Sequence, residues 1–167
     1  MSNRVILQIP LPPYLIHFLK CELKDSDGNL SVTAKSDLGA YLMGLVEESE
    51  KPSSRHIPGT FIECHIPARD RVGKSYDGRN KWLIISDDNL KRFHRIIHKL
   101  MMRELFGKLD LLVDRGEAQR KGGKMTKEIE KFIAKYSGDE AVLSMDNIRK
   151  EYYRYRKKAA SLENTSV

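Results

Sequence analysis

The last quarter of the chain constrains the fold most, because two segments there repeat apolar residues at the spacing of a helix surface. Thr126 can cap a first helix, whose apolar residues recur three and four positions apart: Ile129, Phe132, Ile133 and Tyr136. After the turn-forming stretch SGDEAV, Ser144 can cap a second helix. Its apolar side holds Ile148, Tyr152 and Tyr155 within about 80° of Met145 on a helical wheel. The pattern predicts a helix-turn-helix-like pair at residues 125–160, although the connection is longer than the usual turn.

The preceding residues predict an α+β fold, in which a scaffold domain at 1–115 carries a small N-terminal mixed or antiparallel sheet. Apolar alternation and short apolar runs indicate strands at 4–9, 30–34, 60–67 and 82–85. Pro12 and Pro13 can begin a short helix over 14–23, and Ser36 can cap another over 37–49. A long connecting helix is predicted over 87–113, with an apolar face formed by Leu90, Phe93, Ile97, Leu100, Met101 and Leu105. Its start is marked by Ser86 and two aspartates, and a polar linker with a Gly pair follows at 116–124.

Positive charge is concentrated in the second half of the chain. The net charge is +7, and residues 1–80 hold ten basic and ten acidic residues, so the whole excess lies in residues 81–167. On the last helix, the cations and one phenol occupy the arc opposite the apolar stripe: Arg149, Lys150, Tyr153, Arg154, Lys157 and Lys158. Lysine and arginine neutralise phosphates and release counterions, and an α-helix fits the major groove.

These features predict a non-enzymatic nucleic-acid-binding protein, such as a transcriptional regulator, with duplex DNA preferred over RNA. The expected contacts are the six side chains of the last helix, with Arg149 and the residues near the helix start carrying any base specificity. Two alternatives remain. The basic face is solvated and binds nothing, or the chain is an interaction adaptor that docks an acidic partner or self-assembles through its amphipathic helices.

Two further segments invite a nucleic-acid hypothesis. A polar loop carries Arg69, Arg71, Lys74 and Arg79, and is a secondary candidate for backbone contacts. Its GKS at 73–75 is not a phosphate-binding loop, because the required upstream glycine is replaced by Ala68. The first fifty residues follow the order strand, helix, Gly-containing turn and capped helix of a ribbon-helix-helix arrangement, with Arg4, Ile6 and Gln8 outward. The apparent strand at 30–34 and the neutral charge depart from that arrangement, so an ordinary core strand is the alternative. Homodimerisation is left open.

No constellation of residues predicts catalysis or metal binding. His94 and His98 lie four apart on the long helix, but no third ligand is placed beside them. Cys21, His56, Cys64 and His65 match no standard zinc spacing. We therefore expect no metal and no cofactor, while an enzyme whose site is assembled in space stays open. Two cysteines are too few for a disulfide framework, and no run of about 18 apolar residues occurs. These observations predict a cytoplasmic protein with no membrane partner.

Overall fold

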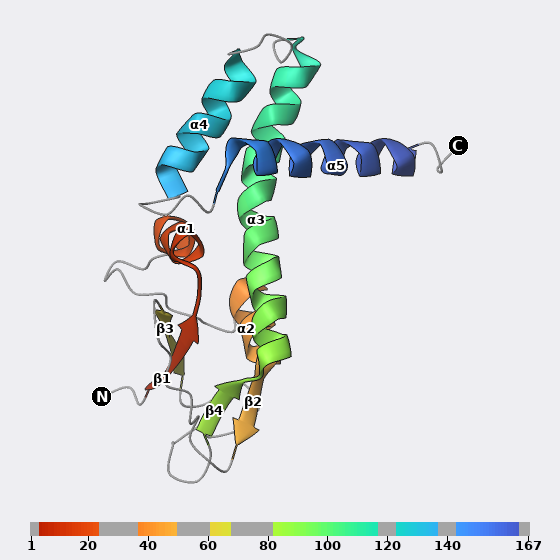
Figure 1. Ribbon diagram of the computed structural model, residues 1–167. Coiled ribbons are helices and arrows are strands. Elements are labelled where there is room, and N and C mark those ends of the chain that lie inside the picture. The colour runs from red at the N-terminus through yellow and green to blue at the C-terminus, as the bar shows by residue number, and fades with distance from the viewer. Residues whose placement is uncertain are drawn as a thin grey trace. The chain divides into compact units, whose positions relative to one another are not determined.

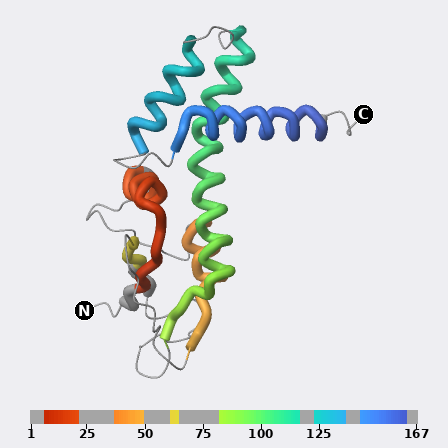
Figure 2. The backbone as a smooth tube through the Cα atoms, viewed as in Figure 1, coloured from red at the N-terminus to blue at the C-terminus, as the bar shows by residue number. Residues whose placement is uncertain are grey.

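The computed structural model describes residues 4–23, 37–49, 61–67, 82–116, 123–136 and 143–163. The chain forms two compact units, Met1–Lys99 and Leu100–Val167, and helix α3 (Asp87–Asp114) contributes to both. Strands occur in the first unit and the long helices of the C-terminal region in the second, as the ribbon and the backbone trace show (Figures 1 and 2). The α+β prediction is therefore confirmed.

In the first unit, the described strands form two antiparallel pairs rather than one sheet. Strand β1 (Arg4–Pro10) pairs with β3 (Phe61–Pro67), and β2 (Val46–Ser49) pairs with β4 (Trp82–Ile85). Apolar alternation determines which side of the first pair is covered: Leu7 and Ile9 are buried and lie opposite Cys64 and Ile62, whereas Gln8 is exposed. Because β1 pairs along its whole length with β3 of the same chain, it fits the core-strand alternative.

The helices of this unit begin where the sequence predicts, but one ends early. Helix α1 (Pro13–Leu23) starts at the proline pair, and α2 (Asp37–Leu45) stops four residues before the predicted end at 49. The last four residues, VEES, form β2 instead. Here the hydrogen bonds between β2 and β4 outweigh the helix propensity of these residues. Glu47 further stabilises the strand, because its Oε1 accepts hydrogen bonds from Ser86 Oγ and Asn89 Nδ2, both at 2.8 Å. The predicted strand at 30–34 and the Ser36 cap lie outside the described residues.

The second unit contains the C-terminal part of α3 with α4 (Lys124–Tyr136) and α5 (Met145–Glu163). Ser144 caps α5 as predicted, since its Oγ accepts a hydrogen bond from Asn147 N at 3.2 Å. The predicted Thr126 cap is wrong: α4 begins earlier, and the carbonyl of Gly123 accepts the first helical bond from Lys127 N. Leu100, predicted to be buried, is 43% exposed.

The core of this unit is drawn from all three helices and from Leu143, which precedes α5. Its buried side chains are Met101, Met102, Leu105, Phe106, Leu109, Ile129, Phe132, Tyr136, Leu143, Ile148 and Tyr152. Most recur at three- and four-residue spacing, as the amphipathic pattern predicts. The predicted linker at 116–124 remains a prediction, because residues 117–122 are not among those described.

Candidate nucleic-acid interface

Helix α5 docks onto α3 through one side of its N-terminal half. Ile148 and Tyr152 are each 2% exposed, and the Tyr152 ring lies 5.4 Å from that of Phe106. Tyr155, one turn further, is 42% exposed but still contacts Phe106, with 5.1 Å between ring centroids. In Figure 1, α5 crosses α3 and its C-terminal part extends beyond the α3–α4 pair. The docked side therefore holds the N-terminal half of α5 on α3, and the C-terminal part of the helix projects beyond it.

A single carboxylate on α3 secures this docking. Asp110 Oδ1 accepts a hydrogen bond from Tyr152 Oη at 2.8 Å and another from Arg156 Nη1 at 3.1 Å. Arg156 also lies 3.8 Å from Asp114. Burial raises the pKa of Tyr152, and its hydrogen bond to the negatively charged Asp110 raises it further.

The contribution of Arg156 was not predicted from the sequence, although a signal for it was present. On the helical wheel, Arg156 falls about 20° from Met145, at the border between the apolar stripe and the cationic arc. A cation at the edge of a docking stripe lies close enough to pair with a carboxylate on the neighbouring element.

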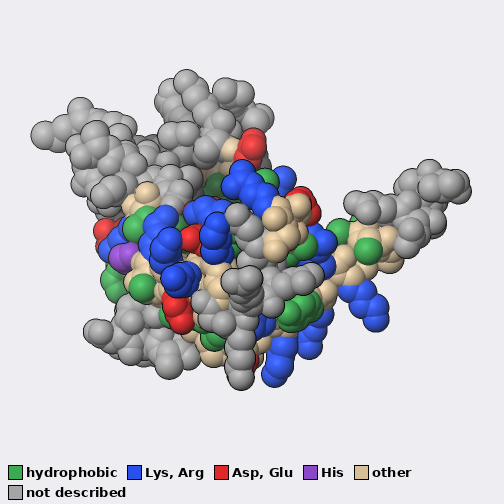
Figure 3. Space-filling model, turned by 90° about the horizontal axis from the view of Figure 1, so that it is seen from above, with side chains coloured by type: hydrophobic (Ala, Val, Ile, Leu, Met, Phe, Trp, Pro, Cys, Tyr) green, Lys and Arg blue, Asp and Glu red, His purple; other side chains and the backbone are tan. Residues whose placement is uncertain are grey.

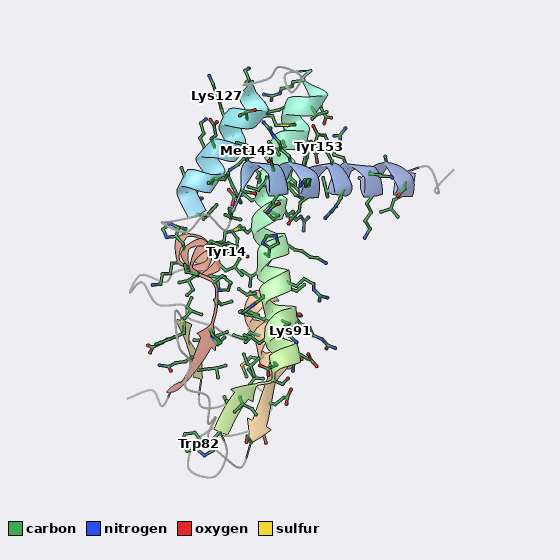
Figure 4. All side chains as sticks on the ribbon, in the orientation of Figure 1. Tyr14, Trp82, Lys91, Lys127, Met145 and Tyr153 are labelled. Carbon is green, nitrogen blue, oxygen red and sulfur yellow. The ribbon has the colours of Figure 1, made fainter. Side chains whose placement is uncertain are left out.

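The opposite side of α5 is the candidate interface. Its side chains, which we call the basic ridge, are all exposed: Lys150, Tyr153, Arg154, Lys157 and Lys158. Within the described part of the chain, none of the four cations in the ridge forms an ion pair. Tyr153, which is 65% exposed, is labelled on α5 in Figure 4. Five of the six residues predicted for the last helix are thus brought together and left open to solvent.

Arg149 differs from the other five predicted contacts. It is half-buried, and its Nη2 donates a hydrogen bond to Thr126 Oγ1 on α4 at 2.9 Å. This bond orients the guanidinium toward α4. The structure therefore separates Arg149 from the basic ridge and gives it a role in joining α4 to α5.

Of the remaining sequence candidates, the two histidines of α3 lie among the described residues and the basic loop does not. The basic loop with Arg69, Arg71, Lys74 and Arg79 lies outside the described residues. His94 and His98 are engaged separately: the Pro10 carbonyl lies 2.8 Å from His94 Nε2, and Tyr14 Oη lies 3.4 Å from His98 Nδ1. Among the described side chains, no cluster of three or more His, Cys, Asp or Glu could hold a metal ion.

The cysteines have contrasting environments. Cys64 is fully buried in β3, and burial raises the pKa of its thiol to about 12, whereas Cys21 on α1 is exposed. Because the thiolate is the nucleophilic form, Cys64 is chemically inert at neutral pH.

Comparison with protein-family models, curated proteins and solved structures found no match. Across the described ranges, none of the helices combines the length and the apolar character needed to cross a bilayer.

Proposed function

We propose that this chain binds duplex DNA through the basic ridge of α5. The observation that carries the proposal is the division of cations on one helix. Arg156, on the docked side, is held by carboxylates of α3, whereas Lys150, Arg154, Lys157 and Lys158 face solvent without an ion pair among the described residues. Cations that are not neutralised internally can release counterions from a polyanion, which supplies sequence-independent affinity.

The dimensions of the ridge suit a duplex. From Lys150 to Lys158 the helix rises about 12 Å, at about 1.5 Å per residue. Phosphates of one strand recur every 3.4 Å or so along the duplex axis, so the ridge can face roughly three to four of them. A major groove about 12 Å wide also admits an α-helix, and the C-terminal part of α5 projects beyond the α3–α4 pair (Figure 1).

The side chains of the ridge favour a duplex over a single strand. Proteins that bind single strands stack successive bases on several aromatic rings, and the ridge offers the ring of Tyr153 alone. Because Arg149 is engaged with Thr126, Arg154 is the guanidinium of the ridge that is available for bidentate pairing with guanine. Phosphate contacts dominate in this proposal, and any sequence preference centres on Arg154.

The test compares two triple variants with equal charge change. Lys150→Ala, Arg154→Ala and Lys157→Ala together should flatten the salt dependence of binding to a duplex of about 20 base pairs, lowering the log–log slope by about 2.7. Arg92→Ala, Arg95→Ala and Lys99→Ala remove the same charge from exposed positions on α3 and should leave the slope nearly unchanged. Circular dichroism checks that helicity is retained. The proposal fails if the wild type does not bind at low salt, or if both triples have equal effects.

A further inference from the structure

A second basic surface lies between α3 and α4, entirely within the second unit. This α3–α4 groove has a volume of about 380 Å³ and is lined by Lys108, Leu111, Leu112, Arg115, Lys124, Lys127, Glu128 and Lys131. Figure 3 shows lysine and arginine side chains on the face seen from above, including those along the arm that α5 forms. Lys127 is labelled on α4 in Figure 4.

The groove continues along both helices. A smaller hollow of about 150 Å³ shares Lys108, Glu128 and Lys131 with it and extends to Glu104 and Lys135. From Glu104 to its end at Asp114, α3 rises about 15 Å, or almost three helical turns. The surface is therefore long enough to accommodate several turns of a docked helix.

The chemistry of the groove differs from that of the basic ridge in two respects. First, it has an apolar floor: Leu111 is 57% exposed and Leu112 is half-buried beside it. Second, some of its cations already have acidic partners, because Lys131 pairs with Glu128 at 2.7 Å and Lys108 with Glu104 at 2.8 Å. Burial opposes ionisation of Glu104, but the hydrogen bond from Lys108 and the charges of Lys108 and Lys135 outweigh it, so the pKa of Glu104 lies below its ordinary value.

We propose that the α3–α4 groove docks an acidic amphipathic helix of a partner protein. Such a helix would place its apolar stripe on Leu111 and Leu112 and its carboxylates beside the cations of the two walls. The larger hollow is lined by five cationic side chains and one carboxylate. A nucleic-acid backbone fits less well, because the apolar side chains of Leu111 and Leu112 form no hydrogen bonds with phosphate. The carboxylates of Glu128 and Glu104 also repel it. This proposal does not depend on DNA binding by the basic ridge.

The experiment uses the full chain and two synthetic peptides of about 15 residues, or some four helical turns. One peptide has leucines at i, i+3/i+4 and i+7 with glutamates on either side, and the other has the same composition with the leucines scattered around the helix. Fluorescence anisotropy should show that the first peptide binds at least about tenfold more tightly than the second. Equal affinity would mean that charge alone drives binding, which would overturn the proposal.

Three single variants locate the peptide site. Leu111→Asn and Lys127→Glu alter exposed groove positions, and each should weaken binding of the amphipathic peptide about tenfold. Lys157→Glu makes the same charge change on the basic ridge and should alter peptide affinity by less than about twofold. Equal effects of Lys127→Glu and Lys157→Glu on the peptide would overturn the proposal. So would a loss of duplex binding in Lys127→Glu as large as that in Lys157→Glu, since the groove would then belong to the nucleic-acid interface.

Discussion

The docked and outward sides of α5 each carry a tyrosine and an arginine, but the two pairs differ in burial and in their partners. On the docked side, Tyr152 is buried and donates to Asp110, and Arg156 is paired with the same carboxylate. On the outward side, Tyr153 and Arg154 are exposed, and no ion pair to Arg154 exists among the described residues. Composition therefore does not determine which cations of α5 are left without an ion pair among the described residues. The position of the carboxylates on α3 determines it, because Asp110 and Asp114 pair with Arg156.

The α3–α4 groove is an intermediate case. Lys108 and Lys131 each have an acidic partner on their own helix, within four residues in sequence. Such exposed pairs contribute little free energy and are readily exchanged for other partners. The groove can therefore still attract an anion, but one that also covers apolar surface, whereas the basic ridge suits a ligand that is charged along its length.

The largest expected effect comes from the two adjacent tyrosines of α5. Tyr152→Ala should lower the free energy of unfolding by about 3–5 kcal/mol, because a fully buried ring leaves a cavity beneath α5. Tyr153→Ala, at a position that is 65% exposed, should change it by no more than about 0.5 kcal/mol. Denaturant unfolding of both variants measures the difference. Similar losses for the two would contradict the division of α5 into docked and outward sides.

An intermediate effect is expected from the Tyr152 hydroxyl. Tyr152→Phe keeps the ring but removes the hydrogen bond to Asp110, which should cost about 1.5 kcal/mol at neutral pH. The pKa of Tyr152 is raised in the folded state, so its stabilising contribution is complete below the unfolded-state value of about 10 and is lost as pH rises above it. The difference in unfolding free energy between wild type and Tyr152→Phe should therefore shrink above about pH 10. A difference that stays constant through that range would show that the hydroxyl does not donate to Asp110.

Much of the fold of the second unit follows from sequence, because its helices have strong apolar periodicity. The spacing of Ile148 and Tyr152 predicts the docked side of α5, and Ser144 predicts its start. What could not be predicted depends on partners distant in sequence. Residues 46–49 form a strand because β4, more than thirty residues later, supplies their hydrogen bonds.

In the candidate site too, contacts between residues distant in sequence could not be predicted. The wheel identifies Lys150, Arg154, Lys157 and Lys158 as outward, and their exposure agrees with it. It cannot reveal that Thr126 on another helix engages Arg149, which lies at the border of the cationic arc. The α3–α4 groove is likewise not predictable from the sequence, because its walls come from two helices and neither contains a distinctive motif.

The smallest expected effect separates two arginines that are two residues apart on α5. Arg156→Ala should lower Tm by no more than about 2–3 °C, because its pairs with Asp110 and Asp114 are partly exposed and screened by solvent. Its effect on duplex affinity should be negligible, since its guanidinium faces α3. Arg154→Ala should leave Tm unchanged and weaken duplex binding at low salt, with a slope smaller by about 0.9. Thermal unfolding and salt-dependent anisotropy on both variants provide the comparison. If Arg156→Ala weakened duplex binding as much as Arg154→Ala, the carboxylates of α3 would not be what separates the two sides of the helix.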